Sequence, residues 1–190
     1  MKIGIDVSQL AYENTGVANY LRNLVQKLIE SDKKNQYILL FSSLRKDLRF
    51  KNNDLTNNSN VTIKKFKIPP TVLDLLWNKL HIMPVESLIG DVDIFITSDW
   101  TEPPVKKAKK ATILYDLLVY KYPEEMHNKT EFSFKNFLIK PNIVKGQKRK
   151  LDWVKKESDM VFCISNSTAE DAKKILGIES NKLSIIYPGM

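Results

Sequence analysis

Pairs of polar, acidic or aromatic side chains stand at the ends of three apolar runs in this sequence. The pairs are Asp99 and Trp100 after residues 93–97, Tyr115 and Asp116 at the end of 111–115, and Ser165 and Asn166 after 160–164. Apolar runs of this length are typical of buried strands, and ligands bind at the carboxyl ends of parallel strands. Carboxylates and hydroxyls there can hydrogen-bond a polar ligand, and an indole ring can stack on a sugar.

Several of these residues also have an ordinary structural interpretation. Trp100 can simply cover the end of a strand, and Asp116 can cap a short following turn. Gly16 precedes a helical pattern, where a residue without a Cβ lets the backbone approach a phosphate or sugar oxygen. A single glycine without a GxGxxG motif is equally consistent with a plain loop. Cys163 lies inside an apolar run and is expected to be a buried, inert thiol.

The chain near residue 167 carries the signals of a helix start. Ser167 and Glu170 have the spacing of a capping box, which predicts Ser167 as the N-cap. Gly177 stands where a left-handed C-cap is expected. Ser165 and Asn166 are then left open, either for a second role in capping or for binding an anion at the helix N-terminus.

Short β-branched runs alternate with longer helical patterns. Strands are predicted over 2–7, 36–41, 61–66, 93–97, 111–115, 160–164 and 182–187, and helices over 17–29, 71–83, 127–158 with a break at Pro141, and 167–176. This alternation is typical of βαβ units. The expected fold class is α/β: one doubly wound Rossmann-like domain over residues 1–187, with a mostly parallel sheet of about seven strands and helices on both faces.

The composition excludes several other classes of protein. Of 190 residues, 43% are hydrophobic and 27% charged, which excludes a disordered chain, a collagen-like fibre and a coiled coil. A single cysteine excludes an internal disulfide, and two distant histidines give no zinc spacing. No apolar run approaches the roughly 18 residues of a membrane span, and the N-terminus lacks a signal-peptide pattern. The cytoplasm is therefore the expected location.

The net charge of +8 is unevenly distributed. Lysines cluster in 106–110, and basic residues interleaved with aromatic ones cover 135–156. These residues can form the solvated face of helices, or an amphipathic surface that rests on anionic lipid at the inner leaflet of the cell membrane. Nucleic acid is a third possible partner, but no recognition motif accompanies the charge, and none is expected to bind.

Four stretches, taken in order, carry a family resemblance. They are MKIGIDVSQL with TGVANYLRNLVQKL, then DVDIFITSDWTEPP, ATILYDLLVYKYPEEM and ESDMVFCISNSTAEDAKKILGIESNKLSIIYPGM. Together they resemble the N-terminal half of GT-B glycosyltransferases of family 4. The matching features include an opening strand with a glycine loop, a Tyr-Asp pair before Tyr-Pro-Glu, and a final strand before Pro-Gly. The resemblance covers nearly the whole chain.

The resemblance implies an activity and a domain arrangement. Enzymes of this family transfer a hexose from a nucleotide-sugar co-substrate to an acceptor, usually with retention and without a metal or other cofactor. Their N-terminal domain mostly holds the acceptor, here a glycan or lipid-linked molecule, and a C-terminal domain holds the nucleotide. Residues 188–190 match the start of the crossing between the two domains. A donor domain is therefore expected in cis or in trans, and the chain alone is expected to be nearly inactive.

The resemblance also assigns roles to particular residues. Gly16 and Val17 would present backbone near the donor phosphate and the acceptor, Asp99 and Trp100 would line the acceptor side, Tyr115 and Asp116 would stand beside the reacting sugar, and Ser165 and Asn166 would close the cleft. Many relatives have histidine where this chain has Tyr115. A tyrosine hydroxyl can hydrogen-bond a sugar, but it is no base near neutral pH unless its pKa is strongly shifted.

Two other functions are consistent with the sequence. The chain can be a non-catalytic half-enzyme that recruits a partner or a membrane. It can also be an unrelated doubly wound protein, although it lacks a Walker loop, a GxGxxG motif and the acidic cluster of a phospho-acceptor domain.

Overall fold

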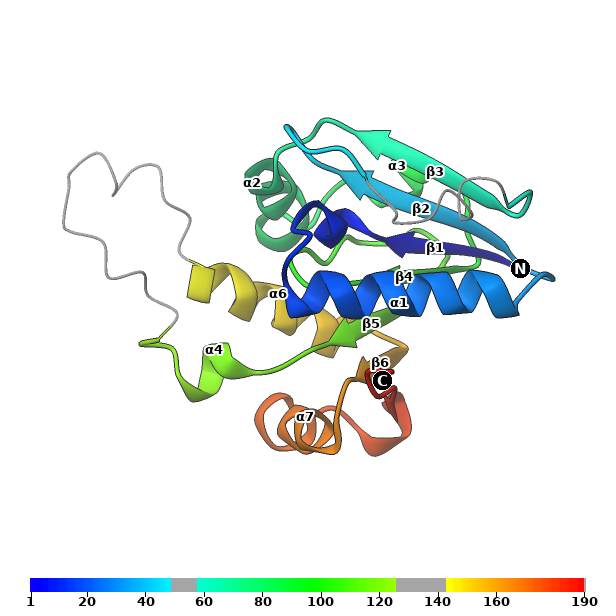
Figure 1. Cartoon of the computed structure of the whole chain (residues 1–190). Helices are drawn as coiled ribbons and strands as arrows, with labels where there is room; N and C mark the ends of the chain where they lie inside the picture. Colours follow the sequence, from blue (N-terminus) through cyan, green and yellow to red (C-terminus); the bar gives the residue numbers. More distant parts are fainter. Residues whose placement is uncertain (49–57, 126–142, 190) are drawn as a thin grey trace.

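The structure is a computed structural model that describes residues 1–48, 58–125 and 143–189. Its centre is a sheet of seven strands in the order β3-β2-β1-β4-β5-β6-β7, and every pair of neighbours is parallel (Figure 1). The predicted α/β Rossmann-like class is confirmed.

All seven predicted strands form, with shifts of at most two residues at their ends. They are β1 (Lys2–Asp6), β2 (Gln36–Ser42), β3 (Val61–Phe66), β4 (Ile94–Thr97), β5 (Lys109–Leu114), β6 (Met160–Cys163) and β7 (Leu183–Ile185). In the central register, Ile5 of β1 lies opposite Leu39 of β2 and Ile96 of β4. A Cβ added to Gly4 would lie 2.7 Å from the Phe95 ring, so glycine allows the close contact of β1 with that side chain.

The helical elements connect these strands. They are η1 (Ser8–Ala11), α1 (Gly16–Ser31), α2 (Pro70–Leu73), η3 (Asp74–Lys79), α3 (Glu86–Ile89), α4 (Leu118–Lys121), α6 (Ile143–Glu157), α7 (Asn166–Asp171), η4 (Ala172–Leu176) and η5 (Ser180–Lys182). The helix predicted over 71–83 is shorter: after one α-helical turn it widens into the π-helical turn η3 and ends at Lys79. Of the helix predicted over 127–158, the part before Ile143 lies outside the described residues.

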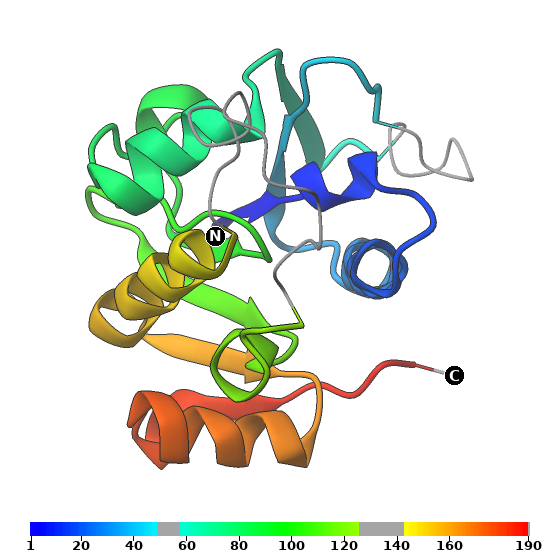
Figure 2. The same ribbon diagram turned by 90° about the vertical axis from the view of Figure 1, so that its left-hand side faces the viewer.

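Helices cover both faces of the sheet, as predicted. The α1 helix packs on one face, against residues that include Leu39 and Ile113. Their chain neighbours Leu40 and Leu114 point to the opposite face, because successive strand residues alternate. There Leu40 packs with residues of α2, η3 and α3, and Leu114 packs with residues of α6 and α7. Figure 2 shows α1 end-on at one side of the sheet and α6 at the other.

One prediction about helix capping is wrong. The N-cap of α7 is Ser165, whose hydroxyl oxygen accepts a hydrogen bond from the backbone N–H of Thr168 at 3.1 Å. Ser167 lies inside the first turn, so no capping box forms, and Glu170 instead pairs with Lys174. The left-handed conformation predicted for Gly177 is confirmed, with φ 68° and ψ 31°.

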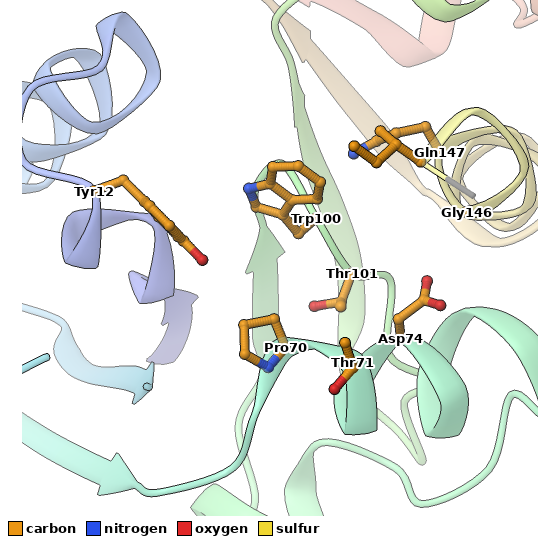
Figure 3. A pocket seen from close by; sticks show the side chains of 9 residues that line it. Tyr12, Pro70, Thr71, Asp74, Trp100, Thr101, Gly146 and Gln147 are labelled. Carbon is orange, nitrogen blue, oxygen red and sulfur yellow. The ribbon is translucent and has the colours of Figure 1, made fainter. Parts of the chain in front are cut away.

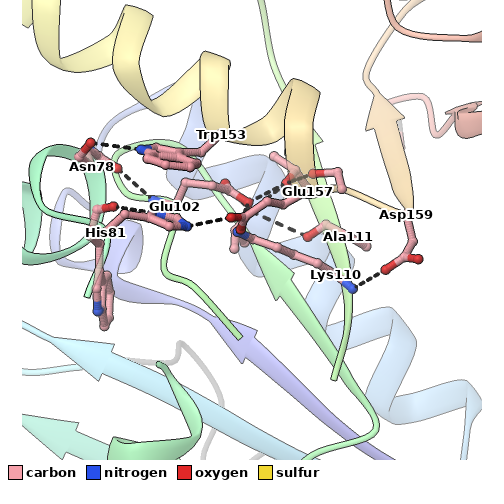
Figure 4. Close-up of polar contacts among 12 residues, drawn as sticks. Asn78, His81, Glu102, Lys110, Ala111, Trp153, Glu157 and Asp159 are labelled. Atoms are coloured by element: carbon pink, nitrogen blue, oxygen red, sulfur yellow. Dashed lines mark hydrogen bonds and ion pairs between the residues drawn. The ribbon is translucent and has the colours of Figure 1, made fainter. Parts of the chain in front are cut away.

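A buried network of charged and polar side chains holds the loop that follows β4 (Figure 4). The Lys110 ammonium lies 3.3 Å from Glu102 and 2.8 Å from Glu157. Glu102 also accepts hydrogen bonds from the hydroxyls of Thr97 and Thr112, at 2.8 and 3.1 Å. Because the network fixes both Thr97 and Glu102, it positions residues 98–101 between them.

The same network ties the C-terminal end of α6 to the segment after η3. The His81 ring donates from Nδ1 to the carbonyl of Trp77 at 2.7 Å, and its Nε2 lies 2.8 Å from Glu157. Its ring stacks on Trp153 at 3.6 Å. Burial alone would raise the pKa of Glu157, but the hydrogen bond and charge of Lys110 and the interaction with His81 lower it below its usual value.

Candidate functional site

The strand order changes direction between β1 and β4. The chain leaves β1 toward β2 on one side, and it leaves β4 toward β5 on the other. In open α/β sheets, the carboxyl ends of two such strands border the usual ligand site. Asp6 ends β1, and Ser98 and Asp99 follow β4, so these side chains stand at that place.

A cavity of about 670 Å³ opens beside this point. It gathers four of the eight predicted site residues: Gly16, Val17, Tyr115 and Asp116. The other residues that line it include Tyr20 and Leu24 of α1, Ile164 after β6, and residues 186–189. The cavity therefore lies where α1, β5 and β6 meet the segment after β7.

The N-terminus of α1 forms one wall of the cavity. The helix begins at Gly16, as predicted, and the Thr15 hydroxyl oxygen caps it by accepting from the backbone N–H of Ala18 at 3.2 Å. A Cβ built on Gly16 would meet no atom within 4 Å, so open space borders this residue. The backbone of Gly16 and Val17 is thus accessible to a ligand in the cavity.

Tyr115 forms the inner wall. Its hydroxyl is 3.1 Å from the Ser98 hydroxyl, and its ring packs edge-to-face on Tyr20 at 5.6 Å. Burial raises the pKa of the Tyr115 phenol well above its usual value. The phenol therefore stays neutral: it can donate or accept a hydrogen bond, but it cannot act as a base.

Asp116 stands at the mouth of the cavity with an exposed carboxylate. One of its oxygens accepts a hydrogen bond from the backbone N–H of Leu118 at 3.0 Å, just before α4. The capping interaction considered from the sequence is therefore present in part. Within the described chain, the second oxygen has no hydrogen bond, so it is available to a ligand hydroxyl.

The charge of one buried lysine lowers the pKa of two acidic groups at the switch point. Burial raises the pKa of Asp6, and hydrogen bonds from Ser8 oppose this shift. Burial also raises the pKa of Asp99, opposed by the charge of Lys150 and reinforced by that of Asp116. The Lys150 side chain on α6 is only 2% exposed, and its charge also favours the ionised form of Asp6.

Sequence reasoning did not single out Lys150, which was grouped with the solvated lysines of 135–156. A signal was present, because Lys150 lies three residues after Gln147 and four before Val154, so the three side chains share one side of the helix with an apolar residue. Asp6, at the end of its strand, was also not among the predicted site residues.

Trp100 borders a second, smaller pocket of about 130 Å³ (Figure 3). Its indole is 42% exposed, so it does not bury itself over the end of β4. The other residues that line this pocket are Tyr12, Pro70, Thr71, Asp74, Thr101, Ile143, Gly146 and Gln147. Asp99, directly before Trp100, connects to the same wall, since its carbonyl accepts from the Gln147 amide at 3.3 Å.

Ser165 and Asn166 are not among the residues that line the cavity or this pocket. The Ser165 hydroxyl is used in capping α7, and Asn166 is the exposed first residue of that helix. Cys163 is fully buried, and burial raises the pKa of its thiol to about 11, as expected for an inert cysteine.

No cluster of three or more His, Cys, Asp or Glu side chains that could hold a metal ion occurs among the described residues. In the same part of the chain, no helix has the length and apolar character needed to cross a membrane. Comparison with protein-family models and with curated proteins finds no match to this chain.

Proposed function

We propose that this chain is the acceptor-side domain of a GT-B glycosyltransferase. Together with a donor domain, it would transfer a sugar from a nucleotide-sugar to a glycan or lipid-linked acceptor, with retention at the anomeric carbon. One observation carries the proposal: residues about 100 positions apart, which the resemblance assigns to one site, line one cavity. They are Gly16 and Val17 on α1, and Tyr115 and Asp116 after β5.

The chemistry of the cavity suits a sugar. The open N-terminus of α1 offers backbone N–H groups to a phosphate or a sugar oxygen. The neutral phenol of Tyr115 and the free oxygen of Asp116 provide one group that can donate and one that accepts. In the transfer, the bond between the donor sugar and the nucleotide phosphate breaks, the acceptor oxygen bonds to the same face of the anomeric carbon, and the departing phosphate takes the acceptor proton.

The segment after β7 supports a donor domain on this side of the sheet. Residues 186–189 border the cavity, and the Tyr20 hydroxyl donates to the carbonyl of Ile186 at 2.9 Å. The proposed crossing at Pro188 and Gly189 therefore starts beside the site that the donor sugar must reach. A donor domain joined in cis, or bound in trans, would complete the cavity from that side.

The test is a sugar-transfer assay on the native gene product, with any separately encoded donor domain added. A panel of nucleotide-sugars is combined with glycan and lipid-linked acceptors. We expect Asp116→Asn to lower kcat/KM by about tenfold or more, because it removes a charged acceptor of a sugar hydroxyl. The matched control is Asp91→Asn, an exposed aspartate that borders a different pocket. Equal rates for the two variants would count against the proposed site.

A second candidate function is recruitment to an anionic membrane, favoured by the basic residues of α6. Lys148 lies over the Tyr120 ring at 4.9 Å, and Lys156 lies over the Trp153 ring at 4.7 Å. Such basic and aromatic side chains together suit the headgroup region of anionic lipid. Vesicle co-sedimentation tests this function: it requires binding to anionic vesicles and none to neutral ones, whereas equal binding to both would exclude the electrostatic attraction.

A further inference from the structure

The pocket between Tyr12 and Trp100 is separate from the cavity at Asp116 and has different chemistry. We propose that it binds a neutral sugar ring of an oligosaccharide acceptor, at a unit other than the one that reacts. The acceptor would then be an oligosaccharide rather than a single sugar. This inference rests on the proposed function for the word acceptor, but the binding of a neutral sugar in the pocket can be tested by itself.

Two exposed aromatic rings border the pocket. Tyr12 is 41% exposed and Trp100 42% exposed, and Figure 3 shows them on facing sides, with the indole nitrogen toward Tyr12. Tyrosine and tryptophan combine a large, rigid apolar surface with a polar tip. Two such rings at one pocket favour a flat ligand that has an apolar face and a polar edge, as a sugar ring has.

Four polar side chains also line the pocket, beside Pro70, Ile143 and Gly146. Figure 3 shows Thr71, Thr101 and Asp74 grouped on one side, with Gln147 beyond Trp100. The Gln147 amide nitrogen donates to the Asp99 carbonyl at 3.3 Å, which leaves its carbonyl oxygen as an acceptor. Within the described residues the hydroxyls of Thr71 and Thr101 make no hydrogen bond. These donors and acceptors match the mixed hydrogen bonding of sugar hydroxyls.

The charge of the pocket selects against an anionic ligand. Among the residues that the structure describes, Asp74 is the only charged one that lines it, and its carboxylate is held by the Asn78 amide at 2.8 Å and by Arg149 at 3.7 Å. A phosphate or a uronic acid would face this carboxylate. The volume of about 130 Å³ is also well below the roughly 300–1,000 Å³ of pockets for drug-sized ligands, so it suits a single ring.

The pocket and the cavity adjoin through residues 98–100. Ser98 contacts the hydroxyl of Tyr115, which lines the cavity, and Trp100, two residues later, lines the pocket. Asp99 lies between Ser98 and Trp100 in the chain, and, besides burial, the charge of Asp116 contributes to its raised pKa. One ligand that occupied both places would have to extend past these residues, and this requires more than one sugar unit.

The indole N–H signals of the three tryptophans test the inference directly. The Trp77 indole donates to the Met83 carbonyl at 3.0 Å, and that of Trp153 donates to the Asn78 carbonyl at 2.9 Å. Within the described chain, the indole of Trp100 has no such partner. In ¹⁵N-labelled protein, we expect neutral disaccharides of glucose, galactose or mannose to shift the Trp100 signal saturably and to leave the other two unchanged.

Variants and anionic probes complete the experiment. By isothermal titration calorimetry, we expect Trp100→Ala to weaken disaccharide binding about tenfold or more, while unchanged Trp77 and Trp153 indole signals confirm that the fold is retained. Tyr122→Ala is the matched control, because Tyr122 is 45% exposed and is not among the residues that line the pocket. Inorganic phosphate and glucuronate should not shift the Trp100 signal.

Each contrary result has a distinct meaning. If no neutral disaccharide shifts the Trp100 signal, or if the anionic probes bind more tightly, the inference is wrong. Sugar transfer that is unaffected by Trp100→Ala would refute the role as an acceptor subsite and leave the proposed function standing. Saturable binding at Trp100 without any transfer by the native gene product would support the pocket and count against the proposed function.

Discussion

Replacement of Lys110 by methionine tests how much the buried network beside the loop of Asp99 and Trp100 stabilises the fold. Lys110 is 1% exposed, and it neutralises Glu102, which is fully buried, and Glu157, which is partly exposed. Methionine fills a similar volume but carries no charge. The substitution therefore leaves the Glu102 carboxylate in the interior without its cation.

The size of the effect follows from the burial of this pair. Removal of one partner of a buried ion pair costs about 3–5 kcal/mol, because the remaining charge is left without compensation. The neighbouring residue gives a matched control, since Lys109 is 77% exposed and lies 4.0 Å from Asp159. Exposed pairs contribute about 0–1 kcal/mol, so Lys109→Met should change stability by no more than that.

The assay is urea unfolding at pH 7, followed by circular dichroism, for both methionine variants. A double variant, Lys110→Met with Glu102→Gln, removes the buried charge that lost its partner and should recover part of the lost stability. A loss below about 1 kcal/mol for Lys110→Met, or equal losses for the two lysines, would refute the reasoning. A double variant no more stable than Lys110→Met would show that the uncompensated charge is not the cause.

Three further predictions concern capping and pH. Ser165→Ala should lower the free energy of unfolding by about 1 kcal/mol, and Ser167→Ala by less than about 0.5 kcal/mol. Equal losses in urea titration would contradict the assignment of Ser165 as the N-cap. The pKa of Glu157 is lower in the folded chain than its usual value of 4.5. Its charge therefore stabilises the fold above that pH, and this contribution is lost as the pH falls through the folded-state pKa. Thermal melts over pH should therefore show a shallower loss of stability in acid for Glu157→Gln, and an unchanged slope would oppose this. Burial raises the pKa of Asp6 above 3.8, so ionisation of Asp6 opposes folding at neutral pH. Asp6→Asn should therefore raise Tm at pH 7 but not below pH 3.8. A lower Tm at pH 7 would contradict the direction of this pKa shift.

The strands and the first helix could be predicted because their signals are local. Short β-branched runs located all seven strands, and β2 is apolar on both faces as a buried parallel strand is, whereas the edge strand β3 carries Lys64 and Lys65. Gly16 is the first residue of α1, and Gly177 ends η4 in the left-handed conformation that favours glycine. The cap of α7 was predicted wrongly because Ser165 and Ser167 lie only two residues apart at the start of the helix, and only the backbone conformation decides which hydroxyl reaches the backbone N–H of Thr168.

The composition of the sites could be predicted only in part. Parallel strands place their carboxyl ends at one edge, and this brought Tyr115 and Asp116 together with Gly16. The pocket at Trp100 depends on Asp74, in a π-helical turn that the helical pattern does not reveal. The buried position of Lys150 depends on how α6 packs, which a run of basic residues conceals.

The measurement that tests the central claim most directly is the anomeric configuration of the product. The native gene product, with any separately encoded donor domain added, is incubated with nucleotide-sugars and candidate acceptors, and the new linkage is followed by ¹H NMR from the first turnovers. We predict transfer with the donor's anomeric configuration retained, and a strong loss of this transfer in Asp116→Asn. Inversion at the anomeric carbon, or no transfer from any nucleotide-sugar, would contradict this prediction.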